Sequence, residues 1–450
     1  MAPLTRRRVT CARPPHELVA RIGPLAPGVR AHALDACAPE GWGTPVDGSK
    51  SGPSLLAVEP EVEFRGGGEA IGELRRWLDP HDGAAPLGAV AVGYLAYDLG
   101  REFERSHEWT PEQAAPGSSP VYMGGFRAVY RWQAEGRRGE VVGSDAAAVA
   151  RLHDLVETAA RAAPPPVPCL GRPGGPPEAE FLDGVRAIRE WIRAGDVYQV
   201  NLSRRLELDR PDAPALAALY GELTARAGAP FSAWIDSGPV QLVSNSPERF
   251  LRVDGRRVES CPIKGTRPRG RTPPEDRWLA KQLEHAPKDR AEHVMIVDLE
   301  RNDLGRVCRT GSVRVARLAA LRSFATVHHL VSCVQGELRD PADWRGLLAA
   351  TFPGGSITGA PKLRAMQIIE QLEPVPRGIY TGAIGYFDAA GGVDLSIAIR
   401  TAVAEGGRLH LQLGGGIVAG SDPDAELQET RDKGDAFARF WEMQAGRAAS

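Results

Sequence analysis

A long alternation of apolar side chains in the C-terminal half limits the folds open to this chain. Val, Leu, Ile or Thr occupies every second position from 393 to 403, Gly406 and Gly407 follow, and leucines alternate again over 409–413. Period two places successive side chains on opposite faces of a strand, and adjacent glycines suit a tight reversal. We therefore predict a strand over 393–403 that forms a β-hairpin with a strand over 409–413, and hence an antiparallel sheet.

Other segments of this half give helix and strand signals in turn. Apolar residues recur at helical spacing from 181 to 192, and Gly195 suits the C-terminal cap of that helix. Residues 200–208 alternate like a half-buried strand, and Asp-Pro at 422–423 is typical of a helix start. These patterns predict an α+β protein with large antiparallel sheets and helices packed outside.

One segment tolerates neither a helix nor a central strand. From 164 to 177, 10 of the 14 residues are Pro or Gly, which predicts an extended linker or a crossing over the surface. The segment divides an N-terminal region, 1–163, from a C-terminal region, 178–450. Within the N-terminal region, apolar and small residues over 87–99 predict a buried strand and a turn.

Composition excludes several classes of protein. The 55 Lys and Arg nearly balance the 57 Asp and Glu, which argues against a chain-wide basic surface for nucleic acid. The sequence contains no run of about 18 apolar residues, so we expect no membrane span. The arginines at 6–8 are not followed by an apolar stretch, so we expect no secretory signal. The six cysteines are scattered without a CxxC pair, which disfavours zinc motifs and a disulfide framework. We expect reduced thiols in a cytoplasmic protein.

Two pairs of acidic residues have a spacing that suits a metal site. Asp289 and Glu292 lie three positions apart in one expected helix, and Glu426 and Glu429 in another. This spacing places both carboxylates of a pair on one helix face. Two such helices facing each other would bind Mg²⁺ through carboxylate oxygens. The alternative interpretation is that both pairs lie on solvated helix surfaces.

Two cationic residues suit a small anionic ligand. Lys264 lies between Pro-Ile and Gly, with Arg267 and Arg269 nearby. Positive neighbours or burial would lower the pKa of its amine and make it nucleophilic, although a plain surface lysine is the alternative. Arg400, expected on the polar face of the 393–403 strand, would bind a carboxylate through its guanidinium fork or form a structural salt bridge.

Two glycine-rich segments also suit such a ligand. The segment 354–362 looks like a phosphate loop but lacks the Lys that a Walker A motif has directly after its second Gly. Its N–H groups would meet an anion such as a carboxylate before a helix over 363–372. The three glycines at 414–416 let a backbone approach a ligand closely, or else form a bulge or turn.

Eight short motifs follow one another in the C-terminal region. They are SNSPERF (244–250), PIKGT (262–266), KDRAEHVMIVDLERNDLGRV (288–307), VHHLVS (327–332), FPGGSITGAPK (352–362), IAIR (397–400), GGGIV (414–418) and AELQET (425–430). Together they resemble the chorismate-utilising enzymes, which include component I of anthranilate synthase and of aminodeoxychorismate synthase, and the isochorismate and salicylate synthases. The N-terminal region is similar chiefly at 92–104. The resemblance implies an interwoven two-layer α/β sandwich like that of anthranilate synthase component I.

Within this family PIKGT favours the aminodeoxychorismate branch, because anthranilate synthases carry Ala in place of Lys264. The segment GDVYQVNLS (195–203) also resembles that branch. The tryptophan-feedback motif LLES of anthranilate synthase has only Leu-Leu-Ala-Val at 55–58 as its counterpart. The resemblance therefore implies conversion of chorismate and ammonia to 4-amino-4-deoxychorismate, for p-aminobenzoate and folate synthesis.

The resemblance also implies roles for single residues. Lys264 would attack C2 of chorismate with loss of the C4 hydroxyl, and ammonia would then add at C4 and expel the lysine, with Glu248 as general acid and base. Glu292 and Glu429 would bind Mg²⁺ directly, with Glu426 close by or acting through water. The implied substrate-binding residues are His329, Thr358, Arg400, Gly415, Gly416 and Lys433.

The source of ammonia defines an expected partner. The chain has no cysteine in a glutaminase context such as GxCxG, so we expect a separate glutamine amidotransferase subunit in a heterodimer. Three alternatives remain open, namely anthranilate synthase component I, an isochorismate or salicylate synthase with water as nucleophile, and a catalytically silent ligand-binding paralogue. The presence of Lys264 together with three acidic residues, Glu292, Glu426 and Glu429, argues against the last.

Overall fold

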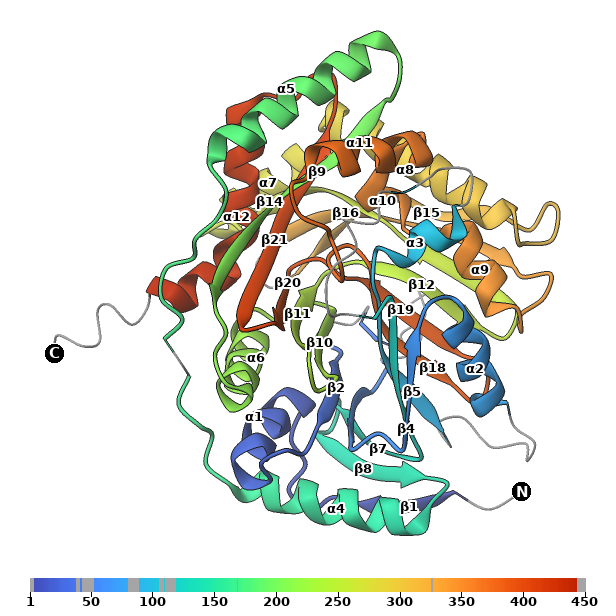
Figure 1. The fold of residues 1–450 in the computed structure, drawn as a ribbon, viewed down its shortest axis with the longest axis vertical. Coiled ribbons are helices and arrows are strands. Elements are labelled where there is room, and N and C mark those ends of the chain that lie inside the picture. Colours follow the sequence, from blue (N-terminus) through green and yellow to red (C-terminus); the bar gives the residue numbers. More distant parts are fainter. Residues whose placement is uncertain are drawn as a thin grey trace, which may run out of the picture.

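Two large antiparallel sheets face each other at the centre of the molecule, and helices cover their outer faces (Figure 1). The computed structural model describes residues 4–37, 41–42, 52–79, 89–104, 109, 119–167, 169–324 and 327–442. The predicted α+β class, with large antiparallel sheets and helices outside, is confirmed.

The first sheet, sheet A, has 11 strands within the described residues. In spatial order they are β1 (Thr5–Arg8), β8 (Arg138–Gly143), β7 (Ala128–Gln133), β3 (Ser54–Val58), β2 (Ala31–Asp35), β10 (Phe231–Asp236), β11 (Gln241–Ser246), β20 (Thr401–Glu405), β21 (Arg408–Ile417), β9 (Gln199–Asp209) and β17 (Gly359–Ala360). The N-terminal region supplies the first five strands, and residues beyond 178 supply the other six.

The second sheet, sheet B, has 10 strands within the described residues. They are β14 (Ile263–Pro268), β16 (Val327–Glu337), β13 (Arg257–Cys261), β12 (Arg249–Asp254), β19 (Val393–Ile397), β18 (Ala383–Asp388), β5 (Val90–Leu95), β6 (Val121–Phe126) and β4 (Val62–Gly66), while β15 (Arg314–Ser323) pairs with β16. Here too strands of both regions pair directly, as Gly385 of β18 does with Gly93 of β5.

The helices pack on the two outer faces. They are α1 (Pro15–Leu25), α2 (Glu69–Leu78), α3 (Leu99–Phe103), α4 (Ala146–Arg161), α5 (Glu178–Ala194), α6 (Ala213–Ala227), α7 (Pro273–Glu284), α8 (Pro287–Gly305), α9 (Trp344–Thr351), α10 (Gly355–Thr358), α11 (Lys362–Leu372) and α12 (Pro423–Glu442). Apolar side chains of α1, α4 and α6 share a buried cluster with sheet A, and those of α2, α8 and α9 share one with sheet B. A third cluster fills the space between the sheets, with Leu34 and Leu242 from sheet A and Val92 and Ile384 from sheet B.

The hairpin and the helix ends predicted from the sequence are present. Val403 pairs with His410, and Gly406 and Gly407 make the turn with φ of 55° and 83°, the left-handed conformation that a two-residue hairpin turn requires. Gly195 ends α5 with φ of 86°. The Ala425 N–H donates a 3.0 Å hydrogen bond to the Asp422 carboxylate at the start of α12.

The prediction of one continuous strand over 393–403 is wrong. Residues 393–397 form β19 of sheet B, whereas residues 401–405 form β20 of sheet A. Between them the chain crosses from one sheet to the other, and Arg400 takes a φ of 52°. Alternation shows only that one face of each strand is buried. Residues 393–397 and residues 401–405 each bury one face, although they do so in different sheets. The alternation of apolar residues therefore continues through the point where the chain changes sheets.

The Pro/Gly-rich segment 164–177 runs along the molecule without helix or extended strand where it is described. Its only β-bridge there joins Gly174 to Glu207 of β9. Because strands on both sides of this segment share both sheets, the N-terminal and C-terminal regions bury a common core. The domain boundaries given above remain a prediction about chain organisation.

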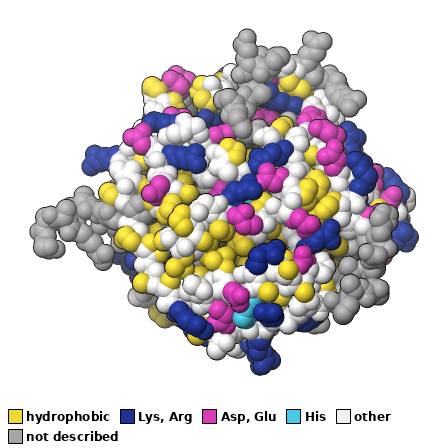
Figure 2. All heavy atoms as spheres, turned by 60° about the horizontal axis from the view of Figure 1, so that its bottom comes forward, with side chains coloured by type: hydrophobic (Ala, Val, Ile, Leu, Met, Phe, Trp, Pro, Cys, Tyr) yellow, Lys and Arg dark blue, Asp and Glu magenta, His cyan; other side chains and the backbone are white. Residues whose placement is uncertain are grey.

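The surface carries charges of both signs. On the face drawn in Figure 2, Lys and Arg side chains alternate with Asp and Glu, and hydrophobic side chains gather toward its centre. This mixture agrees with the balanced composition of 55 basic and 57 acidic residues.

The core of sheet B provides a stability prediction. Phe250 is 1% exposed and packs edge-to-face on Phe352, with ring centroids 5.7 Å apart. Phe250→Ala should lower the free energy of unfolding by about 3–5 kcal/mol, because it leaves a cavity in a close-packed core. Urea denaturation measures this loss. The matched control Leu318→Ala, at a side chain 51% exposed, should stay within about 0.5 kcal/mol of the unsubstituted chain; equal losses in both variants would contradict the packing described.

Candidate active site

Two crossings between the sheets lie side by side and carry two of the predicted site residues. Glu248 lies where the chain leaves β11 for β12, and Arg400 lies where it leaves β19 for β20. The Ile397 N–H donates to the Glu248 carbonyl at 3.0 Å, and the Asn245 N–H donates to the Arg400 carbonyl at 3.0 Å. These two hydrogen bonds tie one crossing to the other.

The crossing also corrects the predicted place of Arg400. Its side chain does not extend from the polar face of a continuous strand, because residue 400 lies between two strands. Burial lowers the pKa of the Arg400 guanidinium, while Tyr380 and Glu429 oppose the shift. The Glu429 carboxylate of α12 therefore lies close enough to Arg400 to act on its charge.

Glu248 is a buried carboxyl, only 5% exposed. Burial raises its pKa to about 7; the Ser356 hydroxyl, the Lys264 ammonium and the Ile263 backbone N–H oppose this rise. A carboxyl with a pKa near neutrality can both donate and accept a proton, so the environment suits the predicted role of general acid and base.

Lys264 extends from β14 toward the same acidic residues. Burial lowers the pKa of its amine, and Lys433 lowers it further, while the carboxylates of Glu292, Glu248 and Glu429 oppose the shift. The lysine is thus placed among three of the predicted acidic residues. A lowered pKa increases the neutral fraction of the amine, which is the nucleophilic form.

The three glycines at 414–416 are part of β21 and pair with β9 in unbroken register, from Gly414 opposite Ser203 to Gly416 opposite Asn201. They form neither a bulge nor a turn. A Cβ on Gly416 would lie 2.9 Å from side-chain atoms of both Asn201 and Gln199, so a larger residue here would require these two side chains to move.

Gly415 faces the charged side chains of α12. A Cβ on Gly415 would lie 3.4 Å from Glu426 Oε2, 3.4 Å from Lys433 Nζ and 3.6 Å from Glu429 Oε1. Lys433 binds Glu429 at 2.6 Å and donates to the Gly414 carbonyl at 2.8 Å. The glycine therefore keeps open a space on which a lysine and two carboxylates converge.

His329 and Thr358 differ in how they relate to this space. Burial lowers the pKa of His329 to about 4, and the positive charges of Arg400 and Lys433 contribute, so the neutral ring is favoured close to the site. Its Nδ1 lies 3.0 Å from the Thr266 hydroxyl. Thr358 is fully buried, and its hydroxyl donates to the Gly354 carbonyl at 2.9 Å, which caps the turn rather than presenting a free donor.

The acidic residues have the donor chemistry of a Mg²⁺ site, since hard cations prefer carboxylate oxygens. Glu426 and Glu429 converge on Gly415, and Glu292 acts on Lys264. Asp289 of the first pair instead binds Arg267 at 3.1 Å. As the side chains stand, no three His, Cys, Asp or Glu residues of the described chain form a ready metal-binding group. A cation at Glu429 would share this carboxylate with Lys433, which binds one of its oxygens at 2.6 Å.

The segment 354–362 is not a phosphate loop. Lys362 is held by Asp303 at 2.6 Å and donates to the Thr351 carbonyl at 3.1 Å. The short helix α10 lies in this segment, and the helix predicted over 363–372 is present as α11, which begins one residue earlier at Lys362. The Ser356 side chain of this segment hydrogen-bonds the Glu248 carboxyl.

Glu300 and Ser356 belong to the same neighbourhood, and the sequence interpretation missed both. Glu300 of α8 is 2% exposed. A signal for it exists, because Ile296, Val297 and Leu304 occupy the same helix face at spacings of three or four and are buried. A glutamate on an apolar helix face indicates a buried, hydrogen-bonded carboxyl.

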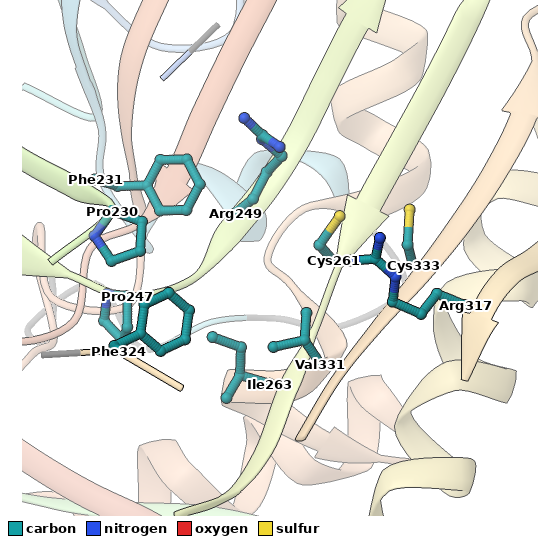
Figure 3. Close-up of a pocket in the computed structure, with 10 residues that line it drawn as sticks. All are labelled: Pro230, Phe231, Pro247, Arg249, Cys261, Ile263, Arg317, Phe324, Val331 and Cys333. Atoms are coloured by element: carbon teal, nitrogen blue, oxygen red, sulfur yellow. The ribbon is translucent and has the colours of Figure 1, made fainter. Parts of the chain in front are cut away.

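A small cavity lies beside Ile263 of β14, the strand that also carries Lys264 (Figure 3). Ile263, Val331, Cys261 and Cys333 are among its lining residues. Its volume of about 30 Å³ is far below the roughly 300 Å³ or more of a ligand pocket. Side chains alternate along a strand, so Ile263 points into this cavity and Lys264 points to the opposite face. The cavity is therefore separate from the site and too small for an organic substrate.

Comparison with known proteins identifies the family. A sequence model of the family described as chorismate binding enzyme matches residues 46–439. The chain belongs to the chorismate binding enzyme family. Motif order in the sequence had predicted this membership, and the prediction is confirmed.

Relatives of this chorismate binding enzyme have two different names. It is 39% identical over 436 residues, 89% of the chain and 87% of the relative, to anthranilate synthase component 1 1 of Haloarcula marismortui. It is 40% identical over 351 residues, 77% of the chain and 76% of the relative, to aminodeoxychorismate synthase component 1 of Salmonella typhimurium. The crystal structure of anthranilate synthase component I from Streptococcus pneumoniae superimposes with a TM-score of 0.74 at 29% identity, covering 85% of this chain and 91% of that one.

Within the described residues, none of the helices combines the length and the apolar character that crossing a membrane requires. The six cysteines are all free thiols, and three of them, Cys261, Cys308 and Cys333, are buried.

The electrostatics of Lys264 give a pH prediction. Because burial lowers the pKa of this amine, its acetylation should titrate below the ordinary lysine pKa of about 10.4. Glu248→Gln removes a charge that stabilises the ammonium, so it should lower the midpoint further. Peptide mass spectrometry after brief acetylation at a series of pH values measures both midpoints. Glu284→Gln, at an exposed position on α7, is the control and should leave the midpoint unchanged; a midpoint at or above 10.4 would contradict this account.

Proposed function

We propose that this chain is component I of an aminodeoxychorismate synthase, which converts chorismate and ammonia to 4-amino-4-deoxychorismate for p-aminobenzoate and folate synthesis. The observation that carries the proposal is the position of Lys264, a lysine of lowered pKa among Glu248, Glu292 and Glu429. Relatives of the same name, such as the one from Salmonella typhimurium, support it.

In the proposed reaction the Lys264 amine forms a bond to C2 of chorismate. Both ring double bonds shift, from C1=C2 and C5=C6 to C1=C6 and C4=C5, and the C4–O bond breaks. The departing hydroxyl takes a proton from Glu248 and leaves as water. Ammonia then forms a bond to C4, both double bonds shift back, and the C2–N bond to Lys264 breaks. The new ammonium group at C4 returns one proton to Glu248. A neutral amine and a neutral carboxyl are needed at the start, and burial favours both forms.

The substrate carries two carboxylates, and the cationic groups around Gly415 suit them. Arg400 and Lys433 would bind these carboxylates, with the N–H groups of Gly415 and Gly416 as further donors, and His329 and Thr358 would lie toward the C4 end. Glu292, Glu426 and Glu429 would hold Mg²⁺, which when bound supplies positive charge at the ring carboxylate. Ammonia would come from a separate glutamine amidotransferase subunit.

A second candidate function is supported by the relatives. Identity to anthranilate synthase component 1 1 of Haloarcula marismortui extends over 89% of the chain, and such an enzyme would eliminate pyruvate after amination. The nature of the product distinguishes the two functions.

Product analysis is the first test. The purified chain, incubated with chorismate, Mg²⁺ and ammonium, should yield 4-amino-4-deoxychorismate by mass spectrometry without release of pyruvate. Replacing ammonium by glutamine should abolish the reaction of the chain alone. Anthranilate with an equal amount of pyruvate would refute the proposed branch, and efficient use of glutamine would refute the separate amidotransferase subunit.

A substitution tests the lysine. Lys264→Ala should lower kcat by about 100-fold or more, because it removes the nucleophile that divides the displacement into two easier steps. The control Lys281→Ala changes a lysine of α7 outside the site and should keep the rate of the unsubstituted chain. Steady-state kinetics on chorismate measures both variants, and an unchanged kcat for Lys264→Ala would exclude the covalent route.

Metal removal tests the acidic residues. EDTA should abolish activity and added Mg²⁺ should restore it. Glu426→Gln should raise the Mg²⁺ concentration for half-maximal activity by about 10-fold or more, since one anionic ligand is lost. Asp432→Asn is the control on the same helix, where Asp432 accepts a hydrogen bond from Gln428. Full activity in EDTA would exclude a metal role for these residues.

A further inference from the structure

Glu300 is a buried carboxylate with two defined donors. The Ser260 hydroxyl of β13 donates to its Oε2 at 3.0 Å, and the Gly355 N–H donates to its Oε1 at 3.3 Å. A carboxylate needs such partners because an ion without them is costly in an apolar environment. Glu300 therefore joins α8 to the first residue of α10.

The turn at 354–358 is held from three sides. Besides the bond from Gly355 to Glu300, the Asn201 amide donates to the Ser356 carbonyl at 2.8 Å. Arg377 donates to the Ile357 carbonyl at 2.9 Å. Three successive residues are thus fixed by three side chains from different elements, and Glu300 is the one that reaches the turn from α8.

The fit between this turn and α8 is close. A Cβ on Gly355 would lie 2.4 Å from Leu299 Cδ2 and 3.5 Å from Glu300 Oε1. Glycine lets the backbone lie against the helix here without displacing the Leu299 side chain, within reach of the Glu300 carboxylate. The position of the neighbouring Ser356 therefore depends on this contact.

We propose that Glu300 is a positioning residue, which holds the turn at 354–358 so that the Ser356 hydroxyl stays bonded to the Glu248 carboxyl. The inference rests on the proposed function, in which Glu248 exchanges protons with the substrate near Lys264. It adds a residue outside substrate contact that determines how Glu248 is oriented and when it ionises.

The charges around the two glutamates support this coupling. Burial raises the pKa of Glu300 to about 7, Asp303 and Glu248 raise it as well, and Lys362 and Ser260 oppose the rise. The groups facing Glu248 are Lys264, Lys433, the Ser356 hydroxyl and the Ile263 N–H. Repulsion between two carboxylates is mutual, so a negative Glu300 also disfavours ionisation of Glu248.

Two substitutions should therefore shift the pKa of Glu248 in opposite directions. Glu300→Gln keeps an oxygen acceptor for Gly355 but removes a like charge, so the pKa should fall by roughly 0.5–1 unit. Ser356→Ala removes a donor that stabilises the carboxylate, so the pKa should rise by a similar amount. Glu259→Gln is the control, because Glu259 is a buried glutamate next to Ser260 that accepts instead from Gln335; it should leave the pKa unchanged.

The experiment uses the full chain and two readouts. The first readout is the rate of chorismate consumption as a function of pH, which does not depend on which product forms. The part of this profile that is due to Glu248 gives the pKa of Glu248 during turnover. Carboxyl ¹³C NMR titration, assigned by comparison with Glu248→Gln, reports the pKa without substrate. A different product from the unsubstituted chain would overturn the proposed function and leave this comparison intact.

Loss of position is tested separately. Glu300→Ala removes the acceptor for Gly355 and should lower kcat by about 10-fold or more with little change in KM, whereas Glu300→Gln should restore most of the loss. Should Glu300→Ala fail to fold, the opposite shifts of Glu300→Gln and Ser356→Ala decide the matter. An unchanged Glu248 pKa in both variants, or equal shifts in the Glu259→Gln control, would overturn the proposal.

Discussion

The site depends on hydrogen bonds that join two chain crossings between the sheets. The Ile397 N–H binds the Glu248 carbonyl, the Ser246 hydroxyl donates to the Ile397 carbonyl at 2.6 Å, and the Asn245 N–H binds the Arg400 carbonyl. A chain that leaves a sheet loses its ladder partners, and buried backbone groups must then find others. Each crossing supplies those partners to the other, which places a carboxyl and a guanidinium at the junction of two layers.

Burial sets the chemistry at this junction. The same desolvation that raises the pKa of Glu248 to about 7 lowers the pKa of Lys264, because a low dielectric disfavours any charge. The acid and the amine therefore approach neutral forms together. Lys433 and Glu429 remain ion-paired at 2.6 Å nearby. The space bordered by Gly415 has basic and acidic side chains side by side. Local cations there suit a small dianion, although the chain as a whole has no excess of positive charge.

Sequence patterns predicted turns and helix ends correctly, but they did not predict which strand belongs to which sheet. The hairpin turn at Gly406 and the helix start at Asp422 follow from backbone preferences of single residues, and both are confirmed. The prediction of one strand over 393–403 was wrong, because alternation indicates that one face of a strand is buried but does not indicate the sheet to which the strand belongs. Motif order grouped Lys264 with the acidic residues, and the structure brings them together. Glu300 was missed although its buried neighbours on the same helix face, Ile296, Val297 and Leu304, were a signal of burial; its partners, Ser260 and Gly355, are distant in sequence and only the fold brings them to it.

One measurement tests the central claim, that Lys264 forms a bond to chorismate during amination. The chain is mixed with chorismate in the absence of ammonia, quenched in acid, digested and examined by peptide mass spectrometry. The account predicts that the peptide containing Lys264 gains the mass of chorismate less one water, and that added ammonium removes the label with release of product. An unlabelled Lys264 in a chain that turns over chorismate, or a label on Lys433 instead, would contradict it.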